Sequence, residues 1–157
     1  MAARNFRALL EAQWAKGNFV CVGLDSELSK IPEAAHVSDS EHPENFMGLD
    51  AETTIAGFNE AIVEATKDLV CAFKPNSAFY EAWGDAGWLA LRATITHIHK
   101  VAPDVPVILD AKRADIGNTN AGYAQMAFDW LGADAITVHP YLGGEALKPF
   151  LDRTDKG

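Results

Sequence analysis

The sequence predicts a single α/β domain over residues 1–157, in which buried parallel strands alternate with helices. Four apolar, β-branched segments are separated by segments with helical periodicity. Strands joined by helices form parallel βαβ units, whose crossovers cover both faces of an open sheet or the outside of a barrel. A closed eight-stranded barrel takes roughly 250 residues. Four units are therefore about half a barrel, unless the sheet is open and complete.

The first unit begins with an amphipathic helix over 5–16. Asn5 is suited to cap this helix, and Gly17 is suited to end it. Residues 18–25 (NFVCVGLD) are typical of a buried strand that runs into a polar loop. The stretch 26–48 carries prolines and charges without periodicity, so we expect a long excursion on the surface.

The second unit pairs a helix capped by Asp50 with the strand 69–75 (LVCAFKP), which Pro75 ends. A short helix over 78–83 follows and is broken at Gly84. A longer helix comes next, with Trp88, Leu91, Ile95 and Ile98 on one face, until Pro103. These elements lead directly into the third unit.

The third strand is VPVILDAK, and the helix after it is expected to be capped by Asn118 or Thr119 and to end at Gly132. Its core face consists of Ala124, Ala127, Phe128 and Leu131. The segment DAITVHP is the fourth strand, and GGEALKPFLD is the last helix.

Composition favours a small-molecule partner. The formal net charge is -9 and the 13 basic residues are scattered, which argues against a nucleic-acid binder. An anionic substrate is compatible with this charge, because a few lysines in a cleft decide the local field. No segment approaches the ~18 apolar residues of a membrane span. Cys21 and Cys71 lie in apolar runs, so we expect buried, reduced thiols in a cytoplasmic protein.

Charged residues close the predicted strands. Asp25 ends the first strand, Lys74 the second, Asp110 and Lys112 the third, and His139 the fourth. The carboxyl ends of parallel strands meet at one rim, where catalytic groups collect. Side chains alternate along a strand, so Asp110 and Lys112 are predicted to project to the same side.

A surface ion pair is the simpler interpretation of Asp110 and Lys112 taken alone. However, Lys74 closes an equally apolar strand at the same rim, so these charges are predicted to share one pocket with Asp115. A cluster of this kind is costly in a low-dielectric pocket unless its signs alternate and each charge is hydrogen-bonded. Such an arrangement is typical of a catalytic site. Asp115 lies beyond the strand, where periodicity does not give its direction.

Four motifs resemble one known family. The segments VGLD, FKPNSAFYEAWG, LDAKRADIGNT and VHPYLGGEALKPFL are similar to those of orotidine 5'-phosphate decarboxylases, in the branch often called type 2. The likeness runs from about residue 18 to residue 157. It implies a (β/α)8 barrel of which this chain holds about the first four βα units. It also implies decarboxylation of orotidine 5'-monophosphate to uridine 5'-monophosphate (UMP) in pyrimidine biosynthesis, with no cofactor and no metal.

The resemblance also implies a role for each site residue. Lys74, Asp110, Lys112 and Asp115 would form a charge array in which Lys112 protonates C6 and Asp110 lies near the departing carboxylate. Asp25 and Lys74 would hold the ribose hydroxyls of the nucleotide. In a homodimer, Asp115 would cross the interface, and Ile116 and Thr119 would contact the substrate from the partner subunit.

Two alternatives stay open. Related metal-dependent sugar-phosphate decarboxylases and hexulose-phosphate aldolases share the Asp-x-Lys-x-x-Asp pattern, although IGNT after Asp115 argues against them. Family members also continue into a fifth strand, and their second half supplies phosphate and pyrimidine contacts. We therefore expect a truncated product with exposed outer strands. Such a product could also be an inactive half-barrel that binds a partner or a nucleotide.

Overall fold

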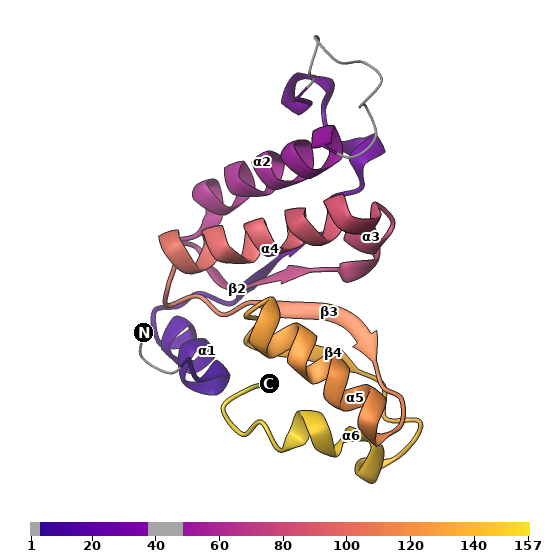
Figure 1. Cartoon of the computed structure of the whole chain (residues 1–157). Coiled ribbons are helices and arrows are strands. Elements are labelled where there is room, and N and C mark those ends of the chain that lie inside the picture. Colours follow the sequence, from indigo (N-terminus) through magenta and orange to yellow (C-terminus); the bar gives the residue numbers. More distant parts are fainter. Residues whose placement is uncertain (1–3, 38–48) are drawn as a thin grey trace.

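The computed structural model describes residues 4–37 and 49–157, and it has the expected α/β architecture (Figure 1). Its first half contains α1 (Phe6–Ala15), β1 (Val20–Leu24), the 3₁₀ turns η1 (Leu28–Lys30) and η2 (Glu33–Ala35), α2 (Leu49–Thr66) and β2 (Val70–Pro75). Its second half contains α3 (Ser77–Glu81), α4 (Gly84–Val101), β3 (Ile108–Arg113), α5 (Gly117–Ala124), the π-helical segment η4 (Gln125–Trp130), β4 (Ala135–Val138) and α6 (Gly144–Leu151).

The four strands are parallel and follow one another in the order β1-β2-β3-β4. β1 pairs with β2, and β3 pairs with β4. Parallel bridges between Phe73 and Val107, and between Asn76 and Asp110, connect β2 to β3. Consecutive strands joined by helices in this order make up about the first four units of a (β/α)8 barrel. All four carboxyl ends therefore lie on the same rim.

The core lies between the strands and the helices that cover them. α2 packs along α4 and α5 packs along α6, as Figure 1 shows. Leu91, Ile95 and Ile98 of α4 are fully buried, as their spacing predicts. Phe73 and Leu109 supply the strand side of this contact and are also fully buried. The packing fixes the strands, and with them the side chains at their ends.

The expected ends of the first helix are confirmed. The side chain of Asn5 accepts a hydrogen bond from the N–H of Ala8 at 2.9 Å, which caps α1. Gly17 has a φ of +85°, the left-handed conformation in which glycine commonly ends a helix. α2 begins at Leu49. The side chain of Asp50, its expected cap, lies outside the described part of the chain.

The expected cap of the helix that follows the third strand, α5, is wrong. α5 begins at Gly117, so Asn118 and Thr119 lie inside its first turn. Asn120 orders this turn instead, because its side chain accepts from the N–H of Asp115 at 2.7 Å and donates to the C=O of Asp115 at 2.6 Å. The core face of this helix is buried as expected, although its second half, η4, is π-helical.

The outer strands differ from each other. β1 leaves its edge open, with Phe19 71% and Val20 61% exposed. For the same reason Cys21 is exposed, which corrects the expectation of two buried thiols; Cys71 is buried, and both are free. At the other edge, the N–H of Ile136 in β4 donates to the C=O of Gly157 at 3.0 Å. The expectation of exposed outer strands therefore holds for β1 and is wrong for this part of β4.

Within the described ranges, no helix is both long enough and apolar enough to cross a membrane.

Candidate active site

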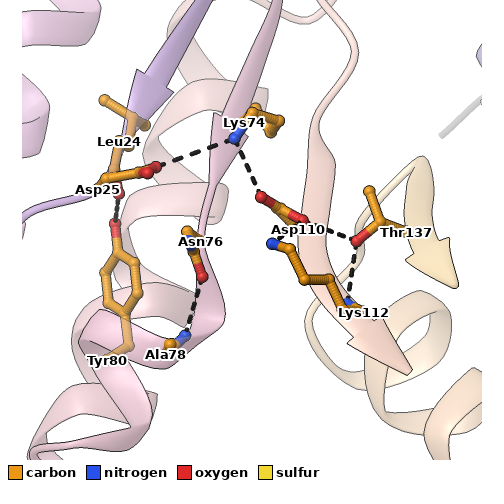
Figure 2. A network of polar contacts seen from close by, with 9 residues as sticks. All are labelled: Leu24, Asp25, Lys74, Asn76, Ala78, Tyr80, Asp110, Lys112 and Thr137. Atoms are coloured by element: carbon orange, nitrogen blue, oxygen red, sulfur yellow. Dashed lines mark hydrogen bonds and ion pairs between the residues drawn. The ribbon is translucent and has the colours of Figure 1, made fainter. Parts of the chain in front are cut away.

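The carboxyl ends of β1, β2 and β3 bring three charged side chains together. Asp25 follows β1 directly, and Gly23 pairs with Lys74 in the register of β1 and β2. The bridge between Asn76 and Asp110 aligns β2 with β3 in the same way. The side chains of Asp25, Lys74 and Asp110 therefore lie in one row across neighbouring strands (Figure 2).

Charges of opposite sign alternate along this row and continue to Lys112. Lys74 Nζ lies 4.0 Å from Asp25 Oδ1 and 3.2 Å from Asp110 Oδ2. Lys112 Nζ lies 2.7 Å from Asp110 Oδ1. Asp110 and Lys112 thus project to the same side of β3, as strand alternation predicts. The convergence of both lysines on one carboxylate is the arrangement expected of a shared site and not of separate surface pairs.

Asp110 is the centre of the cluster and holds its negative charge firmly. Its side chain is only 13% exposed. Burial raises its pKa, but hydrogen bonds from Lys112, Thr137 and Lys74, together with the charge of Lys74, outweigh burial and lower the pKa to about 2. At neutral pH the site therefore contains one fixed anion between two ammonium groups.

Lys112 has an unusual backbone and an accessible side chain. Its φ is +49°, in the left-handed region that L-residues other than Asn and Asp rarely adopt. Its backbone N–H donates to the hydroxyl of Thr137 at 3.0 Å. The side chain is 67% exposed, so its ammonium can contact a ligand while one carboxylate oxygen of Asp110 holds it.

Sequence reasoning missed Thr137, which joins the ends of β3 and β4. Its hydroxyl donates to Asp110 Oδ1 at 2.8 Å while accepting from the N–H of Lys112. One sequence signal was available, because Thr137 is the only polar residue in the strand AITV. The polar residue singled out at this strand end, His139, is instead exposed.

The remaining predicted residues follow β3, with Asp115 and Ile116 on the loop and Thr119 at the start of α5. Asp115 Oδ1 accepts from the N–H of Ile116 at 2.6 Å. Among the described residues, Asp115 forms no ion pair with Lys74 or Lys112, so one chain brings together three members of the predicted four-residue array. Ile116 is 62% exposed and Thr119 is partly buried in the first turn of α5.

At the end of β3, Arg113 contacts the neighbouring helices instead of the charged cluster. Its guanidinium donates to Glu81 of α3 and lies 5.3 Å from the ring centroid of Tyr123 in α5. These contacts connect the end of β3 to the helices on either side of it. They give the strand that carries Asp110 and Lys112 a rigid support.

A second buried carboxylate, also missed, lies before β4 at the opposite end of the strands. Asp134 is fully buried and accepts from Arg4 Nε at 2.7 Å and from the N–H of Val107 at 2.9 Å. His99 Nε2 lies 3.6 Å away. Burial raises the pKa of Asp134, but His99, Arg4 and the Val107 amide together lower it to about 2. This position at the amino ends of the strands indicates a structural role.

An apolar hollow of about 550 Å³ lies on the outer face, between α4 and η4, and is separate from the charged cluster. Its lining residues are Asp85, Trp88, Leu89, Met126 and Trp130. A large apolar hollow is the default ligand site, but this one contains a single charged residue and none of the paired charges. The chemistry therefore favours the rim. In the described ranges, no three His, Cys, Asp or Glu side chains gather into a possible metal site.

Comparisons with known proteins point to one family. The sequence model described as "Orotidine 5'-phosphate decarboxylase / HUMPS family" matches residues 19–157. An orotidine 5'-phosphate decarboxylase of Herpetosiphon aurantiacus is 50% identical over 156 residues, which are 99% of this chain and 51% of the relative. One of Flavobacterium johnsoniae is 47% identical over 136 residues, which are 87% of this chain and 45% of the relative.

Solved structures give the same picture. The OMP decarboxylase of Leishmania donovani superposes with a TM-score of 0.77 at 35% identity, over 98% of this chain and 51% of that chain. The UMP synthase of Leishmania donovani gives the same TM-score and identity, over 29% of its own chain. The chain spans about half the length of the curated relatives it matches.

Proposed function

The chain belongs to the orotidine 5'-phosphate decarboxylase / HUMPS family, and we propose that it carries the reacting groups of an enzyme that converts orotidine 5'-monophosphate into UMP in pyrimidine biosynthesis. The observation that carries this proposal is the Asp110 carboxylate, held between the ammonium groups of Lys74 and Lys112 at the strand rim. The substrate is a small anionic nucleotide, which two lysines in one cluster can attract despite the net charge of -9.

Lys112 is the group that acts on the reacting carbon. When the bond between C6 and its carboxylate breaks, CO2 leaves and the electron pair stays on C6, where the ring delocalises it poorly. An ammonium fixed beside C6 stabilises this charge more than it stabilises the substrate. The same ammonium then gives C6 its proton. Both steps use groups of the chain, so we propose that no cofactor or metal takes part.

Asp110 has two roles in this proposal. It holds the Lys112 ammonium at 2.7 Å, which orients the proton donor. We also propose that it lies near the departing carboxylate of the substrate, and its low pKa keeps it charged. Repulsion between the two anions would be relieved as CO2 leaves.

Asp25 and Lys74 are proposed to bind the ribose. A carboxylate accepts hydrogen bonds from ribose hydroxyls, and an ammonium can donate to the same oxygens. The 4.0 Å between Asp25 Oδ1 and Lys74 Nζ leaves both side chains able to bind a further group. Lys74 would thereby connect ribose binding to Asp110.

A homodimer would complete the array. Asp115 does not reach the lysines of its own chain in the described structure, and the exposed Ile116 beside it suits an interface. We propose that Asp115, Ile116 and Thr119 act in the partner subunit's site. We also propose that the protein acts in the cytoplasm, where its two free cysteines stay reduced.

Two other functions compete with this one. A metal-dependent sugar-phosphate decarboxylase or aldolase would share the Asp-x-Lys-x-x-Asp strand that carries Asp110, Lys112 and Asp115. A non-catalytic half-barrel that binds a partner or a nucleotide is the second alternative. EDTA sensitivity of turnover would support the first alternative, and absence of any turnover would support the second.

The decisive assay follows the absorbance lost as orotidylate becomes uridylate. It should be run with this chain alone and with a chimera in which the remaining part of the Herpetosiphon aurantiacus relative follows residue 157. Turnover in either form that resists EDTA is the expected result. If neither form turns over orotidylate while the intact relative does, the decarboxylase proposal is wrong and the non-catalytic alternative stands.

A further inference from the structure

Behind the end of β1 lies a buried polar network that the proposed reaction does not use. Ser26, Asn59, Tyr80 and Thr94 belong to four different segments of the chain, and each is at most 5% exposed. Two of these segments, α2 and α4, lie side by side (Figure 1). Polar groups removed from water to this extent require partners, because an unpaired buried donor or acceptor is destabilising.

Asn59 is the centre of the network, because its side chain forms hydrogen bonds with all three of the other residues. Its side-chain oxygen accepts from the Ser26 hydroxyl, and its amide donates to Tyr80 Oη at 2.9 Å and to Thr94 Oγ1 at 3.0 Å. The Thr94 hydroxyl in turn donates to the C=O of Ala90 at 2.8 Å. A fully satisfied buried network of this kind is rigid and has one arrangement.

The network forms hydrogen bonds with Leu24 and Ser26, the residues on either side of Asp25. On one side Tyr80 Oη donates to the C=O of Leu24 at 2.8 Å (Figure 2). On the other side the Ser26 hydroxyl binds Asn59. Burial raises the pKa of Tyr80, so its hydroxyl remains a proton donor over the whole range in which proteins are stable.

The Asp25 side chain has little else to hold it. It is 43% exposed, and Lys74 at 4.0 Å is its nearest charged partner among the described residues. Its direction is therefore set by the backbone from Leu24 to Glu27, where the N–H of Glu27 donates to the C=O of Asp25 at 2.9 Å. A carboxylate that must meet a pair of hydroxyls gains affinity when its position is fixed before binding.

We propose that Asn59 and Tyr80 are positioning residues, which hold the backbone on both sides of Asp25 so that its carboxylate is preset for the vicinal hydroxyls of a ribose. The inference rests on the proposed function for the identity of the ligand. The placement of Asp25 itself is a property of the free protein, and it can be measured without any ligand.

The first measurement is amide hydrogen exchange at Glu27 in the full chain. Tyr80→Phe removes the hydroxyl that donates to the C=O of Leu24. We expect this change to speed exchange of the Glu27 amide by about tenfold relative to the buried amides of α4. Tyr123→Phe is the matched control, because Tyr123 is a partly buried tyrosine distant from Asp25 in the chain. It should leave exchange at Glu27 unchanged.

Unchanged exchange at Glu27 in a folded Tyr80→Phe protein would overturn the positioning role. If Tyr80→Phe does not fold, Ser26→Ala decides instead. That variant releases the other side of Asp25 and leaves Tyr80 in place. It is expected to accelerate exchange at Glu27, and the inference is wrong if it does not.

The second measurement is the ratio of the dissociation constants of 2',3'-dideoxy-UMP and UMP, obtained by calorimetry. Wild-type protein should prefer UMP, and Tyr80→Phe should reduce this preference about tenfold by weakening UMP alone. A purely structural defect would weaken both nucleotides equally, which would overturn the inference. In an Asp25→Asn background, Tyr80→Phe should have no further effect on the ratio.

The two measurements separate the two claims. If wild-type protein binds neither nucleotide, nucleotide binding by this chain is contradicted, and exchange at Glu27 alone decides the positioning role. If wild-type protein prefers UMP and the Tyr80→Phe protein keeps the full preference, the positioning role is wrong and the proposed function stands.

Discussion

The ammonium of Lys112 lies 2.7 Å from Asp110 Oδ1, although the backbone of Lys112 is left-handed, with a φ of +49°. Every other residue with positive φ in the described ranges is a glycine. The left-handed conformation costs a residue with a Cβ atom roughly 1–2 kcal/mol. Strain of this kind clusters at functional sites, where the surrounding contacts maintain it. Here the contact is the hydrogen bond from the Lys112 N–H to Thr137.

Glycine usually makes a protein less stable than alanine does, but at position 112 the strain predicts the opposite order. Lys112→Gly and Lys112→Ala both lose the ammonium, but only glycine adopts a positive φ without cost. Lys112→Gly should therefore be more stable than Lys112→Ala by about 1 kcal/mol. Urea denaturation of both proteins measures this difference. Equal stabilities, or a more stable alanine variant, would show that the backbone of Lys112 is not strained.

Thr137 should matter to both stability and chemistry. Thr137→Val removes the acceptor for the Lys112 N–H and one donor to Asp110, so we expect a loss of about 1 kcal/mol in unfolding free energy. Lys112 would also lose its fixed position, which should lower the rate constant of decarboxylation more than it changes substrate affinity. Thr137→Ser keeps the hydroxyl and should behave like wild type. A rate in Thr137→Val equal to that of Thr137→Ser would contradict this role.

Asp134 predicts how stability responds to acid. Its folded-state pKa of about 2 lies below the ordinary value of about 3.9 in an unfolded chain. A depressed pKa contributes stability above the unfolded value, and this contribution is lost as the pH falls from about 5 toward 2. The contribution at neutral pH is about 2 kcal/mol.

The corresponding variant is Asp134→Asn, which should cost about 2 kcal/mol at pH 7 and progressively less in acid. Asp129→Asn is a suitable control, because Asp129 forms an ion pair with Arg153 on the surface. Surface pairs contribute little, so this control should change stability slightly. A stability difference between wild type and Asp134→Asn that stays constant down to pH 2 would contradict the assignment.

The order of elements and the charged row could be read from the sequence because both depend on local patterns. Apolar runs placed the strands, and the rule that parallel strands share a rim brought Asp25, Lys74 and Asp110 together. Asp110 and Lys112 followed from strand alternation.

The supporting residues could not be predicted, because their roles depend on contacts between distant segments. Asn59 and Tyr80 have helical positions that suit many roles, and only the fold brings them behind Asp25. Asp134 accepts a hydrogen bond from Arg4, which is 130 residues away in the sequence. The cap of α5 was predicted wrongly for a similar reason. Local propensity favours Asn118 or Thr119, but in the structure it is the side chain of Asn120 that binds the backbone of Asp115 before the helix.

The decarboxylation rate of Lys112→Ala tests the central claim most directly, in whichever form of the wild-type protein turns over orotidylate. Without the ammonium beside C6, the rate should fall at least ~10²-fold, which is the usual contribution of a general acid. Lys100→Ala, at an exposed position near the end of α4, should keep the full rate. A Lys112→Ala protein that releases CO2 as fast as wild type would contradict the assignment of Lys112 and, with it, the chemistry proposed for this rim.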